Sequence, residues 1–194
     1  MKAIEITALQ SNLTELWHQV TPEASSVDNE LEQLIIENHL RNFLLWHEED
    51  IARREDIGHE PIYKAKRAID GYNQQRNDFI EKIDKHLVAS LTPKTEGCPF
   101  NSETPGMMMD RLSILALKEF HMKEETVRCD AKEEHINKCS DKLTVVTQQI
   151  ADLSLALDTL LTEVKNGTRS FKVYFQFKMY NDSTLNPQLR KSEG

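Results

Sequence analysis

The sequence is poor in the residues that punctuate or cross-link small folds. Its 194 residues include only six glycines, six prolines and three cysteines. So few turn formers argue against an all-β sandwich, which needs a turn after each short strand. The cysteines Cys98, Cys129 and Cys139 are odd in number and show no Cys-x-x-Cys spacing. This argues against a disulfide framework or a zinc knuckle and fits a reducing cytoplasm.

Long apolar runs and an excess of positive charge are also absent. No run of about 18 apolar residues occurs, so we expect no membrane span, and the first residues lack the apolar core of a signal peptide. The net charge of −8 argues against a nucleic-acid binder, because such proteins need a basic surface. We therefore expect one cytoplasmic globular domain over residues 1–194.

Apolar residues at helical spacing predict an all-α bundle of four or five long helices. The clearest signal is a seam with alternating three- and four-residue steps from Ile136 to Val164, in a helix expected over about 131–165. The other helices are expected over about 4–20, 28–56 with Asp28 as N-cap, 61–91 with Pro61 in the first turn, and 104–128. The long seam is typical of a bundle helix, and a homodimeric coiled coil is the alternative.

The C-terminal region changes its period. Between Phe171 and Tyr180 the apolar residues fall at every second position, which is the spacing of a strand. A lone strand needs a partner. We therefore expect residues 168–194 to form an extended or short-strand tail that packs on the bundle or on a partner chain.

Polar residues interrupt the apolar stripes of three expected helices. Asn42 lies on the second helix, Lys66, Asn73 and Arg76 take seam positions of the third, and Asp110 lies just inside the fourth. Unpaired buried charges cost several kcal/mol, so we expect these side chains to meet in one polar layer. Such a layer is either a satisfied network that fixes the helix register or a ligand pocket.

The start of the fourth helix resembles an anion-binding site. Thr104 and Ser102 are both candidate caps, and Gly106 would let a ligand approach the free backbone N–H groups. An ordinary helix cap is the alternative, and the charge of Glu103 would compete with an anion. The residues assigned to an anionic ligand, such as a sugar nucleotide, are Arg53, Lys66, Asn73, Arg76, Thr104, Gly106, Arg111 and Lys118.

A complete catalytic motif is missing. The sequence has no glycine-rich phosphate loop, no nucleophile elbow and no His-Glu-x-x-His, and Glu15-x-x-His18 is only one of the two pairs that a di-iron bundle needs. The candidate catalytic residues are His47, Glu49, Asp110 and His121. Glu81-x-x-Asp84 resembles half of the carboxylate set with which all-α pyrophosphohydrolases hold Mg²⁺. The candidate ligands for Mg²⁺ or Mn²⁺ are therefore Glu49, Asp50, Glu81, Asp84 and Asp110.

Four segments together resemble an uncharacterised bacterial family known only as a domain of unknown function. They are NFLLWHEEDIAR (42–53), KRAIDGYNQQRN (66–77), NSETPGMMMDRLSILALK (101–118) and QFKMYNDSTLNP (176–187). The resemblance implies a helical cytoplasmic protein associated with surface-glycan (lipopolysaccharide or capsule) biosynthesis, with a glycosyltransferase as partner. Two functions stay open: a ligand- or partner-binding accessory protein of that process, or a metal-dependent phosphoester or nucleotide hydrolase.

Overall fold

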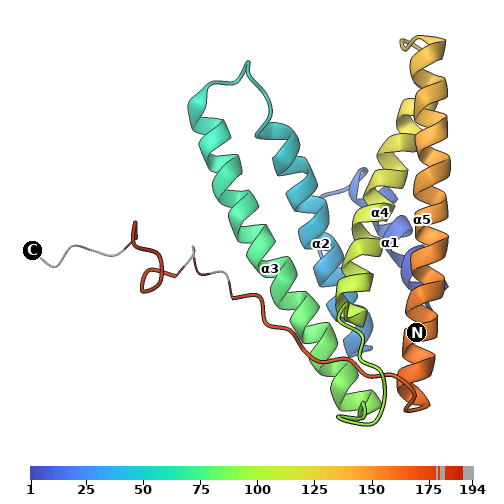
Figure 1. The fold of residues 1–194 in the computed structure, drawn as a ribbon. Coiled ribbons are helices and arrows are strands. Elements are labelled where there is room, and N and C mark those ends of the chain that lie inside the picture. The colour runs from blue at the N-terminus through green and yellow to red at the C-terminus, as the bar shows by residue number, and fades with distance from the viewer. Residues whose placement is uncertain (178, 180–181, 190–194) are drawn as a thin grey trace, which may run out of the picture.

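The computed structural model consists of two antiparallel helical hairpins with a shorter helix behind them (Figure 1). It describes residues 1–177, 179 and 182–189. The helices are α1 (Ala3–Trp17), α2 (Glu30–Ile51), α3 (His59–Leu91), α4 (Pro105–Thr126) and α5 (Glu133–Lys165). The expectation of an all-α bundle is confirmed. Within the described part of the chain, no helix has both the length and the apolar character needed to cross a membrane.

The core forms where the two hairpins meet. α2 packs along α3 and α4 packs along α5, while α1 contacts α2, α4 and α5. The predicted seam of α5 faces this core within the same chain, because each of its nine residues is buried or half-buried: Ile136, Cys139, Leu143, Val146, Ile150, Leu153, Leu157, Leu160 and Val164. The periodicity therefore identified the correct face of α5.

The helix starts follow capping chemistry, with one correction. Of the two candidate caps of α4, Thr104 is the one that acts, since its side-chain oxygen accepts the backbone N–H of Met107 at 3.2 Å. The predicted N-cap Asp28 of α2 is wrong. Asn29 takes that place, and its side chain accepts the backbone N–H of Glu32 at 3.0 Å. Either residue type suits a cap, so the sequence pattern alone did not separate the two neighbours.

The C-terminal segment leaves α5 through a sharp turn and crosses the lower ends of α4 and α3 (Figure 1). Gly167 has a φ of +69°, which ends the helix. Ser170 then forms an isolated parallel bridge with Phe100, and Phe171 is buried in the core. Farther on, the backbone N–H of Gln176 donates to a carboxylate oxygen of Glu81 on α3. Residues 171–177 are extended but pair with no strand in the described chain, and residues 183–185 and 187–189 form turns. Positions 178 and 180 of the predicted strand lie outside the described residues.

Candidate functional site

Polar side chains of α2, α3 and α4 meet in one layer inside the bundle. One carboxylate oxygen of Asp110 accepts the side-chain amides of Asn38 and Asn42 at 3.0 and 2.9 Å. The other lies 3.5 Å from the guanidinium of Arg76. Arg76 also donates to the side-chain oxygen of Asn42 at 3.0 Å. The structure thus brings Asp110 and Arg76 together and surrounds the buried carboxylate with donors.

A buried histidine that sequence reasoning missed extends this layer. The ring of His39 is fully buried, with its Nε2 3.0 Å from the hydroxyl of Thr14 and its Nδ1 2.7 Å from the hydroxyl of Ser113. Desolvation lowers the pKa of His39 to about 3, so the ring is neutral at pH 7. Asn42 also donates to Ser113 at 3.0 Å. Because these groups bind one another, the layer has the character of a network that fixes helix register.

The N-terminus of α4 already holds an anion, and the chain itself provides it. The carboxylate of Asp84, on α3, accepts the backbone N–H of Gly106 at 2.7 Å and a hydrogen bond from Thr104. Desolvation is the largest influence on this carboxyl and raises the pKa of Asp84 to about 6, although both hydrogen bonds act in the opposite direction. A phosphate at Thr104 and Gly106 would have to displace this carboxylate.

Two expected anion ligands lie on the outer side of α4. Arg111 is more than half exposed and pairs with Glu103 at 2.5 Å. It lines a groove of about 560 Å³ between α4 and α5, together with Lys118. The same groove carries the carboxylates of Glu103 and Asp152. Arg111 and Lys118 therefore share a groove, but Arg76 belongs to the interior layer and not to that groove.

The remaining expected residues lie along the α2–α3 hairpin. Arg53 and Lys66 approach the carboxylate of Glu49 at 2.5 and 3.9 Å. Lys66 is exposed, and Ala65 takes the buried seam position instead. Asn73 is half-buried, and its backbone oxygen accepts the side-chain amide of Asn77. The eight residues assigned to an anionic ligand are thus spread over several sites of the bundle.

The five expected carboxylate ligands of a metal do not converge either. Glu49 forms an ion pair with Arg53, Asp84 caps α4, and Asp110 belongs to the interior layer. Glu81 binds the tail, and Asp50 lies 4.0 Å from His47. In the part of the chain that the structure describes, the groups with metal-ligand spacing are two others: His18, His47 and His121, and Glu125, His135 and Cys139.

The first of these groups, here called the histidine cluster, joins three helices. His18 follows the last residue of α1, His47 lies near the end of α2 and His121 lies on the last turns of α4. Ring nitrogens of the three residues lie within 4.8 Å of one another. The ring centroids are 5.2, 5.0 and 5.7 Å apart, and the ring planes cross at 70°, 74° and 79°. The three rings therefore surround one point instead of stacking.

In two of the three rings, those of His18 and His121, Nδ1 lies within hydrogen-bond distance of an oxygen atom of its own helix. Nδ1 of His18 lies 2.7 Å from the backbone oxygen of Thr14, and Nδ1 of His121 lies 2.9 Å from the carboxylate of Glu124. Nδ1 of His47 lies 4.0 Å from the carboxylate of Asp50. An oxygen that only accepts fixes the proton on the Nδ1 it contacts, which leaves the lone pair on Nε2.

The Nε2 atoms of the cluster are buried and have no hydrogen-bond partner. In the described residues, five buried side-chain nitrogen or oxygen atoms lack a partner: Gln10 Oε1, Arg76 Nε and Nε2 of His18, His47 and His121. A buried unsatisfied group costs about 1–3 kcal/mol, so three at one point are unfavourable unless something binds there. In His18 and His121 an oxygen holds Nδ1 and leaves the lone pair on Nε2, which is the arrangement of metal-ligating histidine.

Aromatic side chains hold the cluster in place. Phe120 stacks on His18 with centroids 4.1 Å apart, and Trp46 stacks on His121 at 5.1 Å. Phe43 contacts the rings of His18 and His47 edge-on. Desolvation, followed by the neighbouring imidazoles, lowers the pKa of His47. This favours the neutral ring that a metal ligand requires.

Sequence reasoning found two of the three members of the cluster. His47 and His121 were candidates for acid–base or metal chemistry, whereas His18 entered only as part of Glu15-x-x-His18. The sequence also contains the spacings His-x-x-Asp, at His47 and Asp50, and His-x-x-Glu, at His121 and Glu124. Those spacings place each carboxylate on the same helix face as its histidine.

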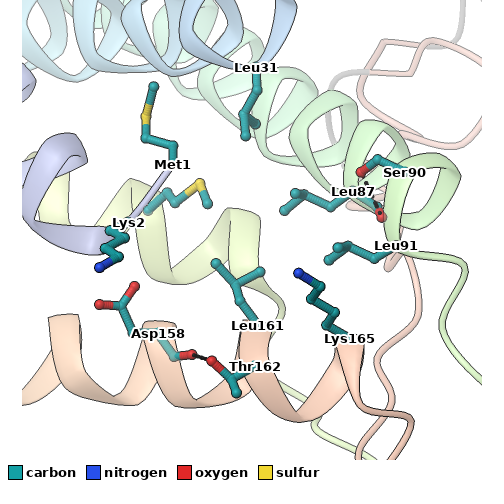
Figure 2. Close-up of a pocket in the computed structure, with 11 residues that line it drawn as sticks. Met1, Lys2, Leu31, Leu87, Ser90, Leu91, Asp158, Leu161, Thr162 and Lys165 are labelled. Atoms are coloured by element: carbon teal, nitrogen blue, oxygen red, sulfur yellow. Dashed lines mark hydrogen bonds between the residues drawn. The ribbon is translucent and has the colours of Figure 1, made fainter.

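A separate cavity of about 500 Å³ lies between the start of α1 and the ends of α3 and α5 (Figure 2). Leu87, Leu91 and Leu161 form apolar walls, and Lys2 and Lys165 reach its rim. None of the residues expected from the sequence to bind a ligand or a metal lines it.

The comparisons with known proteins identify a family but no activity. Residues 32–173 match the family described as "Protein of unknown function (DUF4254)". The match covers most of the chain, and the chain belongs to this family. No curated protein and no solved structure matches it.

Proposed function

We propose that this member of the DUF4254 family binds a transition-metal ion, with Zn²⁺ the favoured ion, between His18, His47 and His121. Two observations carry the proposal: ring nitrogens of the three histidines lie within 4.8 Å of one another, and the Nε2 atom of each ring is buried without a partner. Imidazole suits Zn²⁺ and its neighbours in the transition series, whereas Mg²⁺ requires oxygen ligands. The nitrogen set therefore replaces the carboxylate set expected for Mg²⁺ or Mn²⁺.

The geometry needs little adjustment. Three nitrogens that lie within 4.8 Å of one another can share a centre at most about 2.8 Å from each of them, and a Zn–N bond is about 2.0–2.1 Å long. Side-chain shifts of under about 1 Å thus complete the site. The side chains of His47 and His121 are 39% and 25% exposed, so the cluster lies close to the surface, although its Nε2 atoms are buried.

Three histidines and an open position are the ligand set of a catalytic zinc site, where a bound water acquires a pKa of about 7. This supports metal-assisted hydrolysis as the reaction class, and phosphoesters or nucleotides stay the substrate class predicted from the sequence. The role of an accessory protein in surface-glycan biosynthesis also stays a prediction, and it rests on the family resemblance.

The test compares thermal unfolding of the metal-free chain with and without Zn²⁺, because a ligand that binds only the native state raises the melting temperature. We expect Zn²⁺ to stabilise the protein and Mg²⁺ to leave it unchanged. His47→Ala and His121→Ala should each reduce the zinc-dependent shift, whereas His59→Ala, at an exposed position outside the cluster, should keep it in full.

Two results would count against the proposal. One is an equal zinc-dependent shift in His47→Ala, His121→Ala and the unmodified chain. The other is a cluster that acts only as packing, in which case His47→Ala and His121→Ala would lower the melting temperature of the metal-free protein and zinc would add nothing. Hydrolysis is then tested separately, with chromogenic phosphomonoesters and phosphodiesters and the zinc-loaded chain.

A further inference from the structure

A second cluster of side chains with metal-ligand spacing lies where the C-terminal end of α4 meets the start of α5. It consists of Glu125, from the last turn of α4, and of His135 and Cys139 from the first turns of α5. The last two are four residues apart and therefore share one helix face. The potential ligand atoms of all three residues lie within 4.8 Å of one another.

One imidazole nitrogen stands at the centre of this cluster. Nε2 of His135 lies 2.7 Å from the carboxylate of Glu125 and 3.4 Å from Sγ of Cys139. A ring nitrogen has one hydrogen or one lone pair, so it satisfies one of these two neighbours at a time. Three potential metal ligands of different type thus lie together, and hydrogen bonding through Nε2 of His135 cannot satisfy Glu125 and Cys139 at the same time.

Cys139 occupies a seam position of α5 at which packing alone would favour an aliphatic side chain. Cys139 is a free, buried cysteine at the start of the α5 seam. The other fully buried seam positions are aliphatic, namely Val146, Leu153, Leu157, Leu160 and Val164. Buried cysteine also behaves as a small hydrophobic residue, but here its sulfur faces an imidazole and a carboxylate instead of apolar atoms alone.

The cation that now contacts Glu125 has a second partner. Arg128 lies 3.0 Å from the carboxylate of Glu125, and it also binds Asp130 through Nε and the other Nη at 3.1 and 2.8 Å. The bidentate pair with Asp130 can hold the guanidinium without Glu125. A metal ion on Glu125 would therefore not leave Arg128 unpaired.

We propose that Glu125, His135 and Cys139 form a second, thiolate-containing metal site that binds Zn²⁺ or a similar thiophilic ion and ties the end of α4 to the start of α5. The ion replaces the proton of the thiol, which passes to solvent. The neutral imidazole binds the ion through the lone pair of Nε2 and keeps its single proton on Nδ1. Sulfur, nitrogen and oxygen donors are all regular ligands of zinc. This proposal does not depend on the histidine cluster, which contains no sulfur.

Cobalt titration of the full-length, reduced chain tests the proposal, because Co²⁺ takes the same ligands as Zn²⁺ and shows a near-ultraviolet charge-transfer band only with thiolate. We expect this band in the unmodified protein and in Cys129→Ser, where the changed cysteine is exposed and outside the cluster. We expect its loss in Cys139→Ser and at least about tenfold weaker cobalt binding at this site in Glu125→Gln.

His47→Ala separates the two sites. The charge-transfer band should persist in this variant, even though the histidine cluster has lost a ligand. The proposal is overturned if cobalt in excess gives no charge-transfer band in the unmodified chain, or if the band survives in Cys139→Ser. It is equally overturned if His135→Ala, which keeps the thiol and so the packing at Cys139, binds cobalt with an unchanged band and affinity.

Discussion

Asp110 and Arg111 are neighbours in the sequence but face opposite environments. The side chain of Asp110 is 6% exposed and pairs with Arg76 in the interior, whereas that of Arg111 is 56% exposed and pairs with Glu103 at the surface. The two charged residues at the start of α4 therefore have different roles. One belongs to a buried network, and the other lines an outer groove.

This contrast predicts unequal effects of two adjacent substitutions. Asp110→Ala would remove the carboxylate that pairs with Arg76 and accepts two asparagine amides, and breaking a buried pair costs about 3–5 kcal/mol. Arg111→Ala removes only an exposed ion pair, which is worth about 0–1 kcal/mol. Urea unfolding of both variants measures the difference, and equal destabilisation would contradict the assignment of Asp110 to the interior.

Gly106 offers a second pair of matched substitutions. A Cβ there would lie 2.7 Å from the backbone oxygen of Ile80 and 2.8 Å from the carboxylate of Asp84, whereas nothing lies within 4 Å of a Cβ at Gly71 in the middle of α3. Gly106→Ala should lower the free energy of unfolding by about 1–3 kcal/mol through overpacking. Gly71→Ala should raise it by up to about 1 kcal/mol through helix propensity. A neutral Gly106→Ala in denaturant unfolding would contradict the close approach of α3 and α4.

The raised pKa of Asp84 predicts a pH-dependent effect of Asp84→Asn. Because this pKa is about 6 in the folded chain and the ordinary value is near 3.9, the folded state binds the proton more tightly than the unfolded state. The carboxyl therefore favours folding less as the pH rises from about 4 to 6. Relative to the unmodified chain, Asp84→Asn should gain stability over this window, by up to about 3 kcal/mol. A stability difference that does not vary with pH would contradict the shift.

His39 should act in the opposite direction on acidification. Its folded-state pKa of about 3 lies below the ordinary histidine value of 6.5, so protonation favours the unfolded state. The stability present above pH 6.5 is then lost as the pH falls below it, by about 1.4 kcal/mol per pH unit. His39→Gln should be less stable than the unmodified chain at pH 7 and should lose stability less steeply between pH 6.5 and 5. Unfolding curves at several pH values measure this difference. If His39→Gln and the unmodified chain lose stability with the same slope, the lowered pKa of His39 is contradicted.

The sequence predicted the helices better than it predicted the sites. Periodicity and caps gave five helices and the buried face of α5, because both signals are local in the chain. It also pointed to Asn42, Arg76 and Asp110 as polar interruptions that need partners. It did not predict which polar residues would face each other, since that depends on how the hairpins cross.

His18 shows why the metal site was only partly visible. It lies more than 25 residues before His47 and more than 100 before His121, so no short spacing connects the three. Only the packing of α1 against α2 and α4 brings its ring to the other two. The anion site predicted at Thr104 and Gly106 shows the converse. The helix start predicts a free backbone N–H at Gly106, but in the structure this N–H donates to Asp84 of α3.

The measurement that tests the central claim most directly is a zinc titration of the metal-free Cys139→Ser chain by isothermal calorimetry. This background removes a ligand of the second proposed site, so tight binding reports the histidine cluster. We predict one tightly bound Zn²⁺ per chain and its loss when His47→Ala is added. Absence of tight binding in Cys139→Ser, or unchanged binding after His47→Ala, would contradict a metal ion held by His18, His47 and His121.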